Sequence, residues 1–226
     1  AEALSVITEQ RGLEPQTESR FQWRMLLILN LLLVCLTYFA FGYGLYFYLT
    51  WLQTYLREAR GFSAANSSLL ASLVLATCAI TSMSGGIWTD AWVRRFGLRI
   101  GRCGVAAFAL VGSGVILAIA ATIQNPLAAA LLIAAAAGVA DLAISPVWAI
   151  CLDIGRESAG AVTGCMNTFA NLGGAIAPVV MGYAVEGWHS WTTPLLITAV
   201  IYVAGGDRKS TRLNSSHVAL SRMPSS

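Results

Sequence analysis

The chain has 226 residues, of which 57% are hydrophobic and 11% are charged, and its formal net charge is +3. Soluble domains typically carry about a quarter charged residues, so this composition excludes a soluble globular domain and indicates a polytopic membrane protein. Because one transmembrane helix needs roughly 20 apolar residues, the length leaves room for about six spans. The 5 cysteines stand singly in the apolar runs without the spacing of metal ligands, so no metal site and no cofactor are expected.

The two ends of the chain differ from its apolar middle. Residues 1–24 are polar and do not begin with methionine, so we expect a truncated cytoplasmic linker rather than a signal peptide. Residues 207–226 contain DRKSTRLNSSH and SRMPSS, which match the translation of a common short-read sequencing adapter. We therefore expect this tail not to be native. It carries the whole net charge, and the alternative of a basic tail that binds anionic lipid or nucleic acid is set aside.

The apolar runs between these ends predict six helices, of which the last is cut short. The expected ranges are 25–55, 67–93, 101–123, 126–154, 160–185 and 193–206. In lipid, only helices or closed barrels satisfy every backbone polar group, and long runs without strand alternation favour helices. The expected fold class is therefore an all-α membrane protein.

The first predicted helix carries hydroxyl groups on one face. Tyr43, Tyr46 and Thr50 fall at i, i+3 and i+7, so they can present hydroxyls to a polar cavity. For aromatic residues nearer the outer end, the alternative is an interfacial belt. The belt is the preferred interpretation for Tyr48, Trp51 and Tyr55.

The segment 85–102, GGIWTDAWVRRFGLRIGR, joins the second and third predicted helices and is rich in arginine. By the positive-inside rule this segment stays cytoplasmic and fixes the direction of every other span. Within it, Gly86, Asp90, Arg94 and Arg95 have a spacing in which a carboxylate at a helix end can pair with arginines across the turn. The simpler alternative is a solvated loop. The expected cytoplasmic segments hold Arg11, Arg20, Arg24, Arg94, Arg95, Arg99, Arg102 and Arg156, against Arg57 and Arg60 on the outer side.

The fourth predicted helix carries a carboxyl group near its middle. A carboxylate at mid-membrane is costly, so Asp141 should face a partner or water, and it is a candidate for a polar relay. Asp141, Ser145 and Trp148 fall at i, i+4 and i+7. Pro146 leaves the carbonyl group of Leu142 without its usual partner and can bend the helix there. The alternative for Asp141 is a structural hydrogen bond, and Asp153 beside Arg156 is expected in an ion pair at a loop end.

The fifth predicted helix combines two amides with small residues. Asn167 and Asn171 lie at i and i+4, so their amides point the same way and can bind a polar substrate or join helices. Small residues at four-residue spacing let helices approach closely. They are Gly160, Gly164, Gly174 and Gly182, with Ala170.

Four stretches resemble known transporters. The loop motif is similar to G-x3-D-R-x-G-R-R of the major facilitator superfamily in the copy found in its second half, with Ala91 where arginine often stands. The other three resemble the anion:cation symporter family, which includes bacterial sugar-acid and hexuronate transporters. YFYLTWLQTYL at 46–56 is similar to YFYLTWLPTYL of its seventh helix, with Gln53 in place of the proline that causes a kink. SPVWAICLDIG at 145–155 resembles APAWAVCLDIG of the tenth helix, and residues 164–178 follow G-x2-N-x3-N-x-G-G-x3-P of the eleventh.

This resemblance implies the six-helix carboxy-terminal half of such a transporter. It implies proton-coupled uptake of a small organic anion such as a sugar acid through a bacterial inner membrane. Substrate contacts are then expected at Asn171, Asn167, Tyr43, Tyr46, Ser145 and Trp148. The partners would be the anion, protons, lipid and a missing amino-terminal half that holds the coupling residues.

Two other classes of function are alternatives to a transporter. An integral membrane enzyme needs a deep pair of catalytic groups, and Asp141 has no second deep carboxylate, so no catalytic residue is expected. A membrane scaffold or sensor on the same fold remains the alternative.

Overall fold

In a computed structural model of the chain, residues 29–206 are described, and they contain helices and no strand. The predicted linker at 1–24 and the predicted adapter translation at 207–226 lie outside these residues. Five helical segments are long and apolar enough to cross a membrane, namely 31–50, 64–98, 100–122, 126–155 and 159–188. The all-α membrane class predicted from composition is therefore confirmed.

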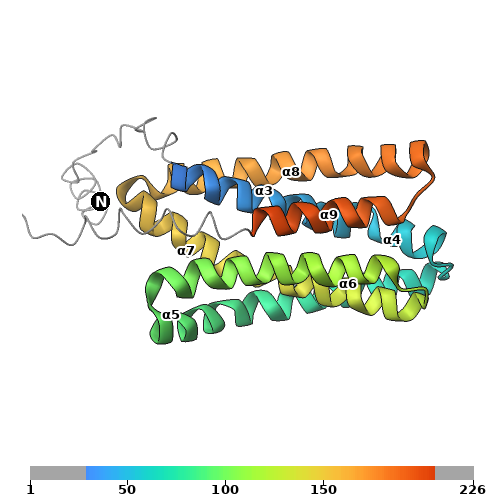
Figure 1. The fold of residues 1–226 in the computed structure, drawn as a ribbon, viewed down its shortest axis with the longest axis horizontal. Coiled ribbons are helices and arrows are strands. Elements are labelled where there is room, and N and C mark those ends of the chain that lie inside the picture. The colour runs from blue at the N-terminus through green and yellow to red at the C-terminus, as the bar shows by residue number, and fades with distance from the viewer. Residues whose placement is uncertain (1–28, 207–226) are drawn as a thin grey trace, which may run out of the picture.

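The helices lie roughly parallel in an elongated bundle (Figure 1). Helix α3 packs along α8, and α5 packs along α6 and α9. Helix α7 contacts both α5 and α8 and so joins the two groups. The elements in chain order are α3 (Leu29–Thr50), α4 (Leu52–Thr54), the π-helix η1 (Tyr55–Ala59), α5 (Ala64–Thr122), α6 (Pro126–Asp141), α7 (Ile144–Gly155), the 3-10 helix η2 (Arg156–Ser158), α8 (Ala159–Trp188) and α9 (Thr192–Gly205).

Helix α5 contains two spans that the sequence placed in separate helices joined by a loop. The structure is helical through both and departs from helical geometry at Gly97, which has φ 82 and ψ 165. Glycine tolerates a positive φ because it has no Cβ atom. The chain folds back there, since a Cβ atom on Gly101 would lie 2.5 Å from the Cα atom of Val93. The expected arginine loop is thus a sharp turn between two helical spans.

The fourth predicted helix, 126–154, is two helices in the structure. Helix α6 ends at Asp141 and α7 begins at Ile144, so the break lies at Leu142 and Ala143. Its place follows from Pro146, which has no N–H to donate to the carbonyl of Leu142 and whose ring crowds that carbonyl. Regular bonding resumes where the Val147 N–H donates to the carbonyl of Ala143 at 3.2 Å.

The first predicted helix is interrupted at Trp51, although Gln53 was expected to remove the kink. The Thr50 hydroxyl donates to the carbonyl of Tyr46 at 2.5 Å, and such a bond often bends a helix. The chain continues through α4 and η1 and turns at Gly61, which has φ 73. The absence of proline therefore does not leave this helix straight.

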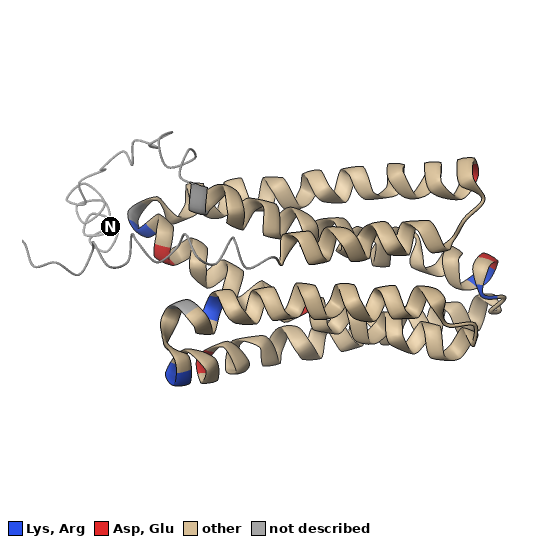
Figure 2. Ribbon diagram, in the orientation of Figure 1, with Lys and Arg blue, Asp and Glu red and all other residues tan. Residues whose placement is uncertain are grey.

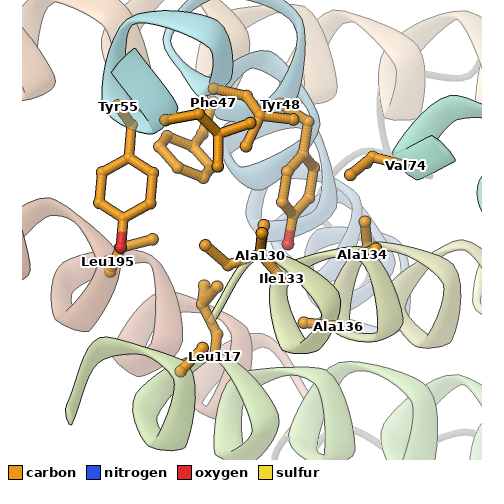
Figure 3. Packing of buried hydrophobic residues seen from close by; sticks show 14 of the residues in the cluster. Phe47, Tyr48, Tyr55, Val74, Leu117, Ala130, Ile133, Ala134, Ala136 and Leu195 are labelled. Atoms are coloured by element: carbon orange, nitrogen blue, oxygen red, sulfur yellow. The ribbon is translucent and has the colours of Figure 1, made fainter. Parts of the chain in front are cut away.

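The core is built from aromatic rings set against small residues of α6 (Figure 3). Phe47 and Tyr48 of α3 pack in one buried cluster with Ala130, Ile133 and Ala134. Alanine lets the helices approach, because it adds little volume between the backbones. The same reasoning applies at Gly138, where a Cβ atom would lie 2.5 Å from the Cγ2 atom of Thr77.

Most charged residues lie at the two ends of the bundle, and one acidic residue lies near its middle (Figure 2). An ion pair joins Arg102 to Asp153, so Asp153 does not pair with its neighbour Arg156 as the sequence suggested. Arg94 and Arg95 are exposed, and in the described part of the chain neither of them pairs with the exposed Asp90. Exposed ion pairs gain little over solvated charges. The expected carboxylate pairing across the turn is therefore absent there.

At the opposite end, Arg60 ties η1 to the end of α5. Its Nε atom donates to the hydroxyl of Tyr55 at 2.7 Å, and its Nη1 atom donates to the carbonyl of Ile123 at 2.7 Å. We expect Arg60→Ala to lower the stability of the bundle by about 2 kcal/mol, because hydrogen bonds from a charged donor are lost. Thermal unfolding in detergent measures this change. The control is Arg57→Ala, since Arg57 is exposed, and an equal loss in that variant would contradict the assignment.

Candidate functional site

The predicted amide pair on α8 meets α3 through Tyr46. The Tyr46 hydroxyl donates to the Oδ1 atom of Asn171 at 3.5 Å, and the Nδ2 atom of Asn171 donates to the carbonyl of Asn167 at 2.9 Å. The ring of Tyr46 lies directly on Gly174, where any Cβ atom would overlap it. The structure thus brings Tyr46, Asn167 and Asn171 together, and we call this group the amide face.

The amide face retains free hydrogen-bonding capacity. Asn167 and Asn171 are exposed, and among the described residues the side-chain amide of Asn167 makes no hydrogen bond. Each amide offers two N–H donors and one carbonyl acceptor without a formal charge. Of these donors, one N–H of Asn171 is occupied by Asn167. The face can therefore bind hydroxyl or carboxylate oxygens.

Close backbone contact between α3 and α8 holds the amide face in place. A Cβ atom on Gly42 would overlap the carbonyl of Ala170, and one on Gly173 would overlap the carbonyl of Phe39. The sequence predicted close approach at Gly160 and Gly164 as well, but a Cβ atom at either would meet no other atom within 4 Å. The contact thus uses only part of the predicted small-residue pattern, and its main glycine, Gly173, was not in that prediction.

Tyr43, predicted beside Tyr46, does not join the amide face. It is 1% exposed and lies in a core cluster to which α3, α5, α6, α8 and α9 contribute. Its hydroxyl makes no hydrogen bond to another described residue. Tyr46, three residues further on, is only half-buried and packs at the edge of this core, whereas Tyr43 lies inside it.

Trp148 is half-exposed at 40%, and its indole N–H donates to the hydroxyl of Tyr38 at 2.9 Å. Tyr38 was missed by the sequence analysis. The available signal was a tyrosine within the apolar run, since a buried phenol usually finds a hydrogen-bond partner.

Ser145 faces α5, because a Cβ atom on Gly85 would lie 3.5 Å from its Oγ atom. The predicted stripe of Asp141, Ser145 and Trp148 is therefore not one surface.

Asp141 lies inside the bundle and is 6% exposed. The hydroxyl of Ser82 on α5 lies near its carboxyl group. The sequence predicted that Asp141 faces a partner or water, and Ser82 is a nearby polar group that it did not identify. Of the described residues, no arginine or histidine forms an ion pair with Asp141.

The described residues carry their cationic side chains at the ends of the bundle. Lysine does not occur between residues 29 and 206, and the arginines of this range lie at or beyond the ends of the spans. No group of three or more potential metal ligands occurs in the described part of the chain. The polar chemistry within the spans therefore comes from neutral amide, phenol, indole and hydroxyl groups and from one buried carboxyl group.

Residues 34–206 match the family described as the Major Facilitator Superfamily. A protein of Cupriavidus necator named as a probable sulfoacetate transporter is 33% identical over 81% of this chain and 43% of its own length. A hexuronate transporter of Bacillus subtilis is 27% identical over 77% of this chain and 42% of its own. A probable galactarate/D-glucarate transporter of Pseudomonas putida is 27% identical over 70% and 36%. The chain thus spans less than half the length of these relatives.

Proposed function

The chain belongs to the Major Facilitator Superfamily, and from this premise we propose that it is the carboxy-terminal half of a proton-coupled transporter for a small organic anion such as a sugar acid. Membership supports a multi-pass membrane protein with a role in transport rather than in catalysis. Relatives named for sulfoacetate, hexuronate and galactarate or glucarate support the anionic substrate. The bacterial relatives support a place in an inner membrane.

The single observation that carries the proposal is the amide face. Asn167 and Asn171 offer exposed neutral donors on α8, and Tyr46 fixes Asn171 from α3. Sugar acids present several hydroxyl groups besides the carboxylate. Neutral amides suit these hydroxyls, because they donate and accept hydrogen bonds without a fixed charge. The proposed role of this half is therefore to recognise the polyhydroxylated part of the substrate.

The charge of the substrate must then be met elsewhere. The spans of this half hold no lysine and no deep arginine among the described residues. Transporters of this superfamily are built from two halves with the substrate near the bilayer midplane between them. We therefore place the group that neutralises the carboxylate on the other half, which we call the partner half. The full-length transporter means this chain joined to that half.

Uptake into liposomes tests the proposal. With the full-length transporter and an acidic outer solution, labelled hexuronate is expected to accumulate, and a protonophore should abolish the accumulation. The 226-residue chain alone is the control and should not transport, since it forms only one wall of the site. Full-length protein that folds and binds sugar acids without moving them would instead support the scaffold or sensor alternative. Transport by this chain alone would also contradict the division of roles between the halves.

A further inference from the structure

Asp141 occupies an unusual place in the bundle. It is the one acidic residue among the buried described residues, and it is the last residue of α6, at the edge of the break before α7. This position is deep within the segment 126–155, which is long enough to cross the membrane. A carboxyl group at this depth is costly when ionised and is commonly functional.

The groups that surround Asp141 are neutral hydrogen-bonding groups. Helix α5 contributes Ser82 and Cys78, both near enough to the carboxyl group to interact with it electrostatically. Helix α3 contributes Tyr38 and α9 contributes Tyr202, both close enough to interact with the carboxyl group electrostatically. No cation from the described residues compensates a negative charge there. A buried carboxyl group without a cation is favoured in its neutral, protonated form.

The break between α6 and α7 is a place where water could reach the carboxyl group of Asp141. The carbonyl of Leu142 has no helical N–H donor, because Pro146 stands where that donor would be. Helix α5 approaches this carbonyl closely, since a Cβ atom on Gly85 would lie 3.3 Å from its oxygen. Tyr38 packs in one buried cluster with Ala140 and Ala143 beside the break, and its hydroxyl accepts the indole N–H of the half-exposed Trp148. Small displacements of α5 or α7 would therefore admit water to the carboxyl group.

We propose that Asp141 is a proton-binding site within this half, protonated while the break is closed, and that it releases its proton to water when the break opens. In the release step the carboxylic O–H bond breaks, a water molecule takes up the proton as hydronium, and the carboxylate remains hydrated in the opened break. This inference deepens the proposed function and rests on its proton coupling. It adds a proton site to the half that holds the amide face, besides any coupling residue of the partner half.

Asp141→Asn in the full-length transporter tests the inference, because asparagine keeps the size and hydrogen bonding of aspartic acid but cannot release a proton. Proton-driven accumulation of hexuronate is expected to fall at least about tenfold, while exchange of internal for external substrate at equal pH should stay within about twofold. The matched control is Glu58→Gln, which neutralises an exposed carboxyl group outside the spans and should change neither rate. Unchanged accumulation in Asp141→Asn would overturn the inference, as would equal loss of accumulation and exchange in a folded variant.

A second measurement needs no variant. Infrared spectroscopy of the wild-type chain with isotope-labelled aspartate should show a protonated carboxyl band at neutral pH, because Asp141 is buried away from water, whereas Asp90 and Asp153 are exposed to it. Absence of that band would overturn the inference even if Asp141→Asn fails to fold. Wild-type protein that accumulates no substrate under a pH gradient would contradict the proposed coupling instead. In that case the infrared band alone decides whether Asp141 holds a proton.

Discussion

Gly173→Val is expected to prevent formation of a stable bundle. A side chain at Gly173 would overlap the carbonyl oxygen of Phe39, which belongs to the backbone of α3 and cannot turn aside as a side chain can. Helices α3 and α8 would have to separate along their contact. Overpacking a tight core costs about 1–3 kcal/mol, and a clash with the backbone lies at or above the upper end of that range. Yield of monodisperse protein in detergent and its thermal unfolding measure the effect.

Gly164→Val is the matched control for this prediction. It lies on the same helix, makes the same chemical change and carries the same difference in helix propensity, but a Cβ atom there meets no other atom within 4 Å. We expect it to reach near wild-type yield. If both variants were lost to the same degree, the effect would come from valine within α8 and not from the contact with α3.

The sequence predicted the helical class and most of the spans because membrane helices must be long and apolar. The range 160–185 lies within α8, and the described residues of the other five predicted ranges are helical apart from the breaks at Trp51 and at Leu142 and Ala143 and from the range ends at Ile123 and Gly206. The tightness of the turn between the two spans of α5 could not be predicted, since the arginine-rich segment is compatible with a loop or with a helix end. Only the backbone conformation of Gly97 decides between them.

The sequence pattern predicted the helix break at Leu142 but not the interruption at Trp51. The break at Leu142 follows from the missing N–H of Pro146, a property of a single residue. The interruption at Trp51 has no such marker, because it depends on the hydroxyl of Thr50 and on the rings of Trp191 and Tyr55 packed beyond it. Breaks caused by contacts between distant residues are not visible in a local pattern.

In the candidate site, too, features within one helix were predictable and contacts between helices were not. The i and i+4 spacing of Asn167 and Asn171 indicated that both amides share one side of α8, and both are exposed there. Their partner Tyr46 was predicted only as a member of a face that also held Tyr43, which the structure buries. Partners from other helices, such as Tyr38 and Ser82, could not be assigned, because their contacts depend on how α3, α5 and α7 pack.

Asn171→Ala is expected to weaken sugar-acid uptake by the full-length transporter about tenfold or more. The change removes the exposed N–H donor and leaves the Tyr46 hydroxyl without its acceptor. Loss of a hydrogen bond to substrate costs about 1 kcal/mol, and an unpaired partner adds to that cost. Asn167→Ala should have a smaller effect, since this amide has no partner in the described residues that orients it. Initial rates of labelled hexuronate uptake give the comparison.

Thr168→Ala is the matched control on the same exposed part of α8. Its hydroxyl donates to the carbonyl of Gly164 at 2.9 Å within the same helix, so its removal should leave uptake unchanged. Membrane insertion and protein level must be equal in all three variants. A fall in uptake that only follows a fall in protein level would show that Asn171 joins helices and does not bind substrate.

The most direct test of the amide face is a double-mutant cycle in which one change is made in the protein and the other in the substrate. Affinities of a set of sugar-acid analogues, each lacking one hydroxyl, are compared in the wild-type transporter and in Asn171→Ala. If the amide of Asn171 binds one hydroxyl, the analogue that lacks it will lose affinity in the wild type but lose nothing further in the variant, because interacting groups are not additive. Equal losses in both proteins for every analogue would contradict the proposal that this half recognises the hydroxyl groups of the substrate.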